Sequence, residues 1–183
     1  MSRSVLVAAV AVVISCASAQ AGFVQGTFWC EFPDDPNQVN HDWTFDYGLE
    51  ELTLGEAIPA VGPDSVIMSG ETNMDPTFHV LKDVQNLSGV EWTGYILTLS
   101  GIDVSFQGPA GSTRFSTVDV SPNMIEFYAP NPVPHGDSVT LDFYINVAST
   151  GLFQFTVTQN PVPEPATLGL LAVGGLAMLR RRR

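Results

Sequence analysis

Basic residues are scarce in this chain. Of its 183 residues only 7 are Lys or Arg, against 19 Asp or Glu. Five of the seven lie near the two ends, and only Lys82 and Arg114 lie within residues 22–161. Because that region also holds 18 acidic residues, 2 basic against 18 acidic residues give it a net charge of −16. Nucleic acid and anionic lipid head groups are therefore poor partners, whereas cations, basic proteins and neutral glycans remain compatible.

Cysteine is scarce as well, with only Cys16 and Cys30. Cys16 falls in a leader-like N-terminal segment, so an exported chain would keep Cys30 alone and could form no intramolecular disulfide. Cys30 lies in an aromatic segment, residues 28–32. We expect it to be a buried apolar side chain, with an intermolecular disulfide or a reactive thiol as the alternative.

Motifs of common catalytic sites are absent. There is no G-x-S-x-G elbow, no H-E-x-x-H, no C-x-x-C and no P-loop. His41, His79 and His135 are isolated in the sequence, and we do not expect them to converge on a metal. The sequence predicts a protein that is not an enzyme and has no catalytic residue, no cofactor and no metal. A glycosidase-like carboxylate pair stays an alternative, because acidic residues are dense.

The body of the chain has the apolar alternation of β-strands. Residues 139–147 alternate apolar and polar side chains over nine positions, and residues 153–158 do the same after a break at residues 149–151. These two segments predict a hairpin whose apolar faces turn to one core.

Shorter alternating segments precede this pair, and turn-forming residues separate them. We expect strands around residues 66–70, 78–84, 95–99, 115–120 and 124–128. Turn signals include residues 62–64, 86–89, 108–111 and 131–136, and only residues 49–57 leave a short helix as an alternative. This pattern is typical of an all-β fold, a single β-sandwich of the Ig-like or Greek-key type.

One segment has the ligand types of a cation site. Residues 34–42 read DDPNQVNHD, and Asp46 follows. Ca²⁺ takes such carboxylate and amide oxygens, but the glycine and glutamate of an EF-hand loop are missing. We interpret the segment as a solvated turn, with Ca²⁺ binding as the alternative.

The three tryptophans are Trp29, Trp43 and Trp92. We expect them in the core, with a stacking platform for sugars as the alternative.

The N-terminus has the pattern of a helical signal peptide. Arg3 is followed by an apolar run at residues 5–14 and then by small residues. Two A-x-A sites predict export through the Sec translocon and cleavage by signal peptidase after Ala19 or Ala21. A lipoprotein-like box at residues 13–16 leaves lipidation of Cys16 as an alternative.

The C-terminus combines three features in a fixed order. First comes a Pro-Glu-Pro box, formed by Val162, Pro163, Glu164 and Pro165. The apolar run 166–179 follows, and the chain ends in Arg180, Arg181, Arg182 and Arg183. As a helix this run would rise about 21 Å, short of the roughly 30 Å hydrocarbon core. The arginines favour the cytoplasmic side, so a marginal membrane anchor is one interpretation.

This order resembles the PEP-CTERM protein-sorting signal of Gram-negative and related bacteria. The resemblance implies that exosortase, a membrane-embedded cysteine transpeptidase, recognises the tail, cleaves near the box and releases or re-anchors the protein outside. It implies a signal peptide at 1–21, an exported domain at 22–161 and a sorting tail at 162–183, membrane-associated until processing. We interpret residues 161–165 as a stiff linker between domain and tail.

A second resemblance concerns the domain itself. Two segments are similar to small secreted bacterial Ig-like domains: the turn at residues 134–138, which leads into the last alternating strands, and residues 92–95.

From the tail above all, we expect an exported surface or matrix protein with a structural or adhesive role, for instance in exopolysaccharide or biofilm material. A carbohydrate- or Ca²⁺-binding module is the second interpretation, and an extracellular hydrolase is the third.

Overall fold

The structure is a computed structural model that describes residues 22–33 and 40–164 of the chain. Within these residues the chain forms eleven β-strands and no helix, which confirms the predicted all-β class. The strands are β1 (Trp29–Glu31), β2 (His41–Asp46), β3 (Glu51–Ile58), β4 (Asp64–Thr72), β5 (Thr77–Asn86), β6 (Trp92–Gly101), β7 (Val104–Ser112), β8 (Thr117–Ser121), β9 (Met124–Val133), β10 (Ser138–Val147) and β11 (Gly151–Pro163).

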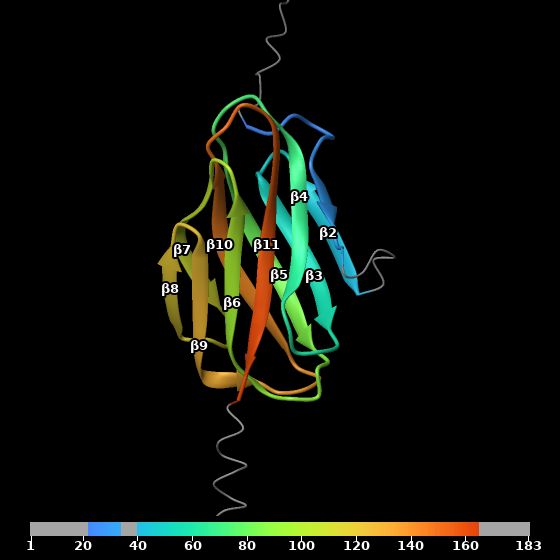
Figure 1. Cartoon of the computed structure of the whole chain (residues 1–183), viewed down its shortest axis with the longest axis vertical. Helices are drawn as coiled ribbons and strands as arrows, with labels where there is room; N and C mark the ends of the chain where they lie inside the picture. Colours follow the sequence, from blue (N-terminus) through green and yellow to red (C-terminus); the bar gives the residue numbers. More distant parts are fainter. Residues whose placement is uncertain (1–21, 34–39, 165–183) are drawn as a thin grey trace, which may run out of the picture.

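These strands make two sheets that lie face to face (Figure 1). One sheet has six strands in the order β1-β4-β11-β6-β9-β8, and the other has five in the order β2-β3-β5-β10-β7. β3 and β5 pair in parallel, whereas the other strand pairs are antiparallel. The two-layer arrangement fits the predicted β-sandwich, and the Ig-like type stays a prediction.

One hydrophobic core fills the space between the sheets. Every second side chain of a strand turns to the same face, and the alternating apolar residues of β10 and β11 are buried accordingly. One end of the core is aromatic, with edge-to-face or stacked contacts among Phe23, Phe28, Phe45 and Phe78. Burial of these large side chains is the main stabilising contribution to the fold.

The last two strands do not form the hairpin that the alternation predicted. β10 pairs with β5 and β7 of the five-stranded sheet, whereas β11 pairs with β4 and β6 of the six-stranded sheet. Residues 148–150 therefore carry the chain from one sheet to the other, and the two apolar faces meet across the core. Alternation shows which face of a strand is buried, and it does not show which strand lies beside it.

The strands also show what two further segments form, residues 108–111 and residues 49–57. The turn expected at residues 108–111 lies inside β7, where Tyr144 pairs with Gln107 and Asp142 pairs with Gly111. Three residues of β7 thus face one residue of β10, and Gly108 has a positive φ of 69°, so the glycine belongs to a bulge rather than a turn. Residues 49–57, where a helix was the alternative, contain the start of β3.

β11 extends past the boundary expected at residue 161. Val162 pairs with Gly94 of β6, and Pro163 pairs with Trp92 after a register shift. The Glu164 amide still donates a hydrogen bond to the Glu91 carbonyl oxygen, at 3.0 Å. The first residues of the expected linker are therefore the end of a strand, and the described chain leaves the fold only after Glu164.

The two ends of the described chain lie at opposite ends of the six-stranded sheet. Phe23 pairs with Thr72 at the end of β4, whereas Gln159 of β11 pairs with Asp64 at the beginning of β4. Figure 1 shows β11 running towards the lower end of the molecule, away from the first described residues. The expected sorting tail thus leaves the domain at the end remote from the expected signal peptide.

Several sequence predictions lie outside the described residues. These are the signal peptide with Ala19 and Ala21, the lipidation alternative at Cys16, residues 34–39 of the acidic segment, and Pro165 with the rest of the tail up to Arg183. The expected transmembrane run, 166–179, is among them. Within residues 22–33 and 40–164, no helix is long and apolar enough to cross a membrane.

Candidate functional site

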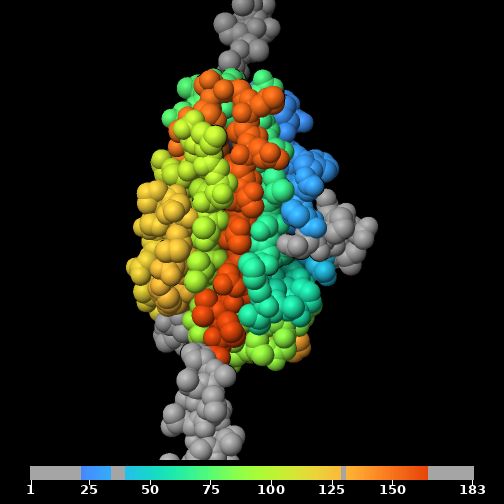
Figure 2. All heavy atoms as spheres, in the orientation of Figure 1, coloured from blue at the N-terminus to red at the C-terminus, as the bar shows by residue number. Residues whose placement is uncertain are grey.

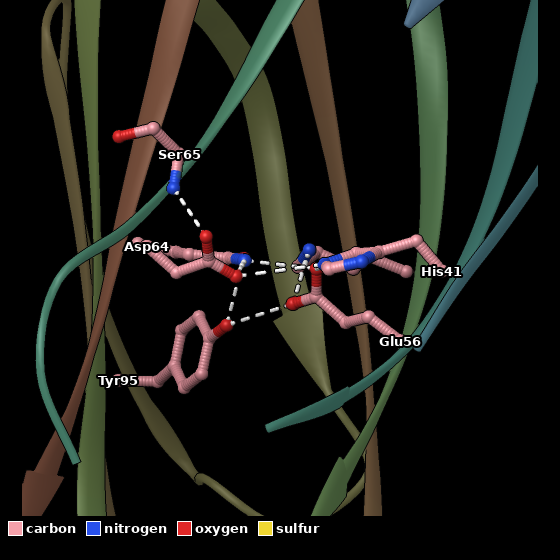
Figure 3. A network of polar contacts seen from close by, with 7 residues as sticks. His41, Glu56, Asp64, Ser65 and Tyr95 are labelled. Carbon is pink, nitrogen blue, oxygen red and sulfur yellow. Dashed lines mark hydrogen bonds and ion pairs between the residues drawn. The ribbon is translucent and has the colours of Figure 1, made fainter. Parts of the chain in front are cut away.

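Six polar side chains meet in the core between the two sheets. His41, Glu56 and Lys82 come from β2, β3 and β5 of the five-stranded sheet. The other three come from β4, β6 and β11 of the six-stranded sheet: Asp64, Tyr95 and Gln159. We call these six residues the inter-sheet cluster. Figure 3 shows His41 and Glu56 reaching in from one side and Asp64 and Tyr95 from the other.

Strand register explains why these residues meet. His41 and Glu56 are directly opposite each other in β2 and β3. Asp64 and Gln159 are directly opposite each other in β4 and β11. Each pair turns its side chains inward at the same end of the molecule, so the two pairs face each other across the gap between the sheets. The cluster is consequently a product of both sheets.

The two carboxylates of the cluster are tied to several donors. Lys82 Nζ lies 2.6 Å from Glu56 Oε1, and the Tyr95 hydroxyl donates to the same oxygen at 3.2 Å. Gln159 Nε2 donates to Glu56 Oε2 at 2.8 Å and to Asp64 Oδ2 at 3.1 Å. His41 Nε2 lies 3.6 Å from Glu56 Oε2 and 3.5 Å from Asp64 Oδ2.

Burial and hydrogen bonding together set the pKa values of the cluster. Burial alone would raise the pKa of the Asp64 carboxyl, but hydrogen bonds from His41, the Ser65 amide and Gln159 outweigh it and lower the pKa to about 2. Burial lowers the pKa of the Lys82 ammonium, and the nearby Glu56 carboxylate partly offsets this. The pKa of Tyr95 is raised well above its ordinary value, first by burial and then by Glu56. Asp64 is therefore ionised and Tyr95 is a neutral hydrogen-bond donor near neutral pH.

A second polar group lies on the outer face of the five-stranded sheet. His79 of β5 is 3.0 Å from Glu51 Oε2 through Nδ1 and 2.8 Å from Asp142 Oδ1 through Nε2. Its ring stacks on Tyr144 at 4.7 Å. Burial would lower the pKa of His79, but the hydrogen bonds and charges of Asp142 and Glu51 outweigh it and raise the pKa. This imidazole bridges β3, β5 and β10 in a half-exposed setting.

The three histidines have separate surroundings. His41 belongs to the inter-sheet cluster, and His79 lies between two carboxylates on the outer face. His135 lies in a loop, where its Nδ1 accepts a hydrogen bond from the Gly89 amide at 3.1 Å. The three imidazoles therefore lie in three different places of the fold.

Asp46 follows the acidic segment and lies at the surface, whereas the three tryptophans differ in their exposure. Asp46 Oδ1 accepts hydrogen bonds from the Gly48 and Leu49 amides and so caps the turn after β2. His41 and Asp42, the last residues of the expected solvated turn, lie in β2 instead. Trp92 is fully buried, as predicted, whereas Trp29 is 55% exposed and packs edge-to-face on half-buried Trp43 at 5.4 Å. The prediction was wrong for Trp29 because this residue lies on the outer side of β1, a three-residue strand at the edge of its sheet.

Cys30 is a free, fully buried side chain. Burial raises the pKa of its thiol to about 12, although the Lys82 charge acts in the opposite direction. The thiolate that nucleophilic chemistry requires is therefore not populated near neutral pH. The burial of Cys30 confirms the expectation of a buried apolar side chain.

Sequence reasoning missed the inter-sheet cluster, although Glu56, Lys82 and Gln159 occupy inward positions of otherwise apolar alternations. Glu56 follows Leu52 and Leu54 at the inward positions of β3, and Lys82 lies between the buried Val80 and Val84. A polar side chain at an inward-facing position of a strand needs a hydrogen-bond partner in the core. That signal predicts buried polar groups, but it does not say which of them pair.

The sorting box lies at the end of the same strand that contributes Gln159. A sequence model of the PEP-CTERM protein-sorting motif matches residues 161–183. No curated protein and no solved structure matches the chain. The motif implies export, processing by exosortase and anchoring through the C-terminal segment before processing. The chain thus ends in a PEP-CTERM sorting motif, and its all-β domain continues directly into that motif.

Proposed function

We propose that this protein is a structural or adhesive component of the cell surface or extracellular matrix and performs no catalysis. The observation that carries the proposal is the continuity of β11 with the sorting motif. The motif begins at residue 161, whereas β11 ends at Pro163 and the Glu164 amide is bonded to the domain. Only Pro165 separates that residue from the apolar run, so the domain is held close to the membrane until the tail is processed.

The use of polar groups supports a structural role. Glu56 and Lys82 tie two strands of one sheet, and Gln159 ties Glu56 to Asp64 of the other sheet. Through these contacts the charged side chains of the core are paired with other residues of the cluster. Such a network gives the two sheets a defined relative position, which a load-bearing surface domain requires.

A carbohydrate-binding role is the second candidate, and it rests on the exposed tryptophan. Trp29 offers an aromatic face at the edge of the molecule, supported from behind by Trp43. Aromatic faces at a wet surface are suited to stacking on sugar rings. Neutral or cationic exopolysaccharide fits the acidic domain better than an anionic one.

Intact mass spectrometry of the protein from its native host tests the sorting part of the proposal. Membrane and medium fractions are measured separately. We expect a mass that lacks residues 1 to about 21 and the tail beyond Pro165. A membrane-bound form that retains residues 166–183 as the final product would contradict processing.

Binding to the host's own exopolysaccharide distinguishes the two roles. The variant Trp29→Ala is compared with Leu152→Ala, which removes another exposed apolar side chain, 86% exposed. Selective loss of binding in Trp29→Ala supports the carbohydrate module. Adhesion or matrix assembly that needs the chain but tolerates Trp29→Ala supports the structural role, and a host unaffected by deletion of the chain contradicts it.

A further inference from the structure

Three potential metal ligands converge within the inter-sheet cluster. They are His41 Nε2 of β2, Glu56 Oε2 of β3 and Asp64 Oδ2 of β4, and these atoms lie within 4.8 Å of one another. Each comes from a different strand, and the third comes from the opposite sheet. We propose that these three side chains bind one divalent transition-metal ion, with Zn²⁺ as the best chemical fit.

The distances from the imidazole nitrogen to the two carboxylate oxygens suit a shared ion. His41 Nε2 lies 3.6 Å from Glu56 Oε2 and 3.5 Å from Asp64 Oδ2. A typical N–H···O hydrogen bond is shorter, about 2.9 Å. Two ligands held about 2.1 Å from one tetrahedral Zn²⁺ lie roughly 3.4 Å apart. Both nitrogen–oxygen separations are thus close to a coordination edge, and a bound ion would replace the present contact of His41 with Asp64.

The remaining carboxylate oxygens are held in place by other donors. Asp64 Oδ1 accepts a hydrogen bond from the Ser65 amide at 2.7 Å. Glu56 Oε1 is bound by Lys82 and Tyr95. In each carboxylate one oxygen is fixed and the other faces His41, as shown in Figure 3. Outer partners of this kind orient the ligands of metal sites.

The charge balance of the cluster also favours a cation. The carboxylates of Glu56 and Asp64 bring two negative charges, and Lys82 brings one positive charge. Between the two oxygens that face His41, the donor now present is the amide nitrogen of Gln159. The Gln159 oxygen now accepts a hydrogen bond from the Tyr95 hydroxyl at 2.9 Å. Rotation of the amide would exchange its two ends, so that the oxygen faces a bound ion and the nitrogen faces the Tyr95 hydroxyl. Lys82 lies on Glu56 Oε1, so it does not occupy the ligand oxygen.

An ion has a route to this position. The side chain of Asp64 is 19% exposed, whereas that of Glu56 is fully buried. A hollow of about 320 Å³ lies against Asp64 and His41 and is lined by residues 57–63, which are the end of β3 and the loop before β4. An imidazole with two carboxylates suits Zn²⁺ better than Ca²⁺, which takes oxygen ligands. The bound ion would join β2 and β3 to β4 across the core.

Calorimetric titration of the chelator-treated full chain with ZnCl₂ tests the site. We expect about one Zn²⁺ per chain, and at least about tenfold weaker binding in His41→Gln and in Asp64→Asn. The matched control is His79→Gln, which removes another imidazole that lies between two carboxylates, here on the outer face. This control should bind Zn²⁺ as the wild type does. Circular dichroism establishes whether each variant is folded.

Absence of Zn²⁺ binding by the wild type would overturn the proposal. Unchanged affinity in His41→Gln and Asp64→Asn, or loss only in His79→Gln, would also overturn it. Should both cluster variants fail to fold, the wild-type unfolding temperature decides. It rises with Zn²⁺ but not with Ca²⁺ if the proposal holds, because only an ion that binds the folded state stabilises it. An equal rise with both ions points to an oxygen-only site and contradicts the assignment.

Discussion

Lys82 is the residue on which the inter-sheet cluster depends most. It is one of only two Lys or Arg residues in residues 22–161, and its side chain is 2% exposed. Its ammonium lies 2.6 Å from Glu56, whose side chain is fully buried. Removing one member of a buried ion pair leaves the other charge in a medium of low polarity, which is far more costly than losing an exposed pair.

The variant Lys82→Met should lower the free energy of unfolding by about 3–5 kcal/mol, because Glu56 would keep an uncompensated buried charge. The matched control is Arg114→Met. Arg114 pairs with Asp137 at 2.6 Å, but the two side chains are 36% and 47% exposed. Its removal should cost less than about 1 kcal/mol. Urea unfolding of both variants measures the difference, and equal losses would show that Lys82 does not compensate Glu56.

At the scale of elements, β11 has two roles. Its middle residues complete the core and pair with β4 on one side and β6 on the other. Figure 2 shows it running the length of the six-stranded face between these neighbours. Its last residues belong to the sorting motif, where Pro161 is buried and Val162 is half-buried. The end of β11 is therefore part of both the folded domain and the sorting motif.

A chain that ends at Glu164 should be as stable as the full chain, whereas one that ends at Asn160 should lose roughly 2 kcal/mol. The loss arises because buried Pro161 and the last backbone pairing with β6 are removed. Urea unfolding of the three chains measures it. If the two shortened chains unfold alike, the first residues of the motif contribute nothing to the domain.

At the scale of the whole molecule, negative charge dominates one face. The outer side of the five-stranded sheet carries five carboxylates that are exposed or half-buried: Asp42, Asp46, Glu51, Asp83 and Asp142. By contrast, the residues that alternate outward along β11 are uncharged: Leu152, Gln154, Thr156, Thr158, Asn160 and Val162. The molecule thus presents an acidic face and a face whose central strand is uncharged, and like charges on the acidic face repel one another.

Raising NaCl from about 20 to about 300 mM should raise the unfolding temperature, because salt screens this repulsion. Differential scanning calorimetry at pH 7.5 measures the change. Near the sequence pI of about 4.3 the same salt should have little effect, because the net charge is small. An unfolding temperature that falls with salt at pH 7.5 would mean that exposed ion pairs such as Arg114–Asp137 outweigh the repulsion.

The sequence by itself determined the all-β class and the presence of the sorting motif. The alternation of residues 139–147 and 153–158 follows from the two-residue period of a strand, and the tail order 162–183 is local as well. Such signals need no partner far along the chain. For the same reason they indicated that the faces of β10 and β11 are buried.

Only the tertiary structure decided how these strands combine. β10 and β11 lie in different sheets, and Gln159 meets Glu56, 103 residues earlier in the chain. The register of one sheet places His41 opposite Glu56, and that of the other places Asp64 opposite Gln159. The three ligands meet because both pairs lie at the same end of the core. Register and layer depend on the packing of the whole core, so a local pattern cannot specify them.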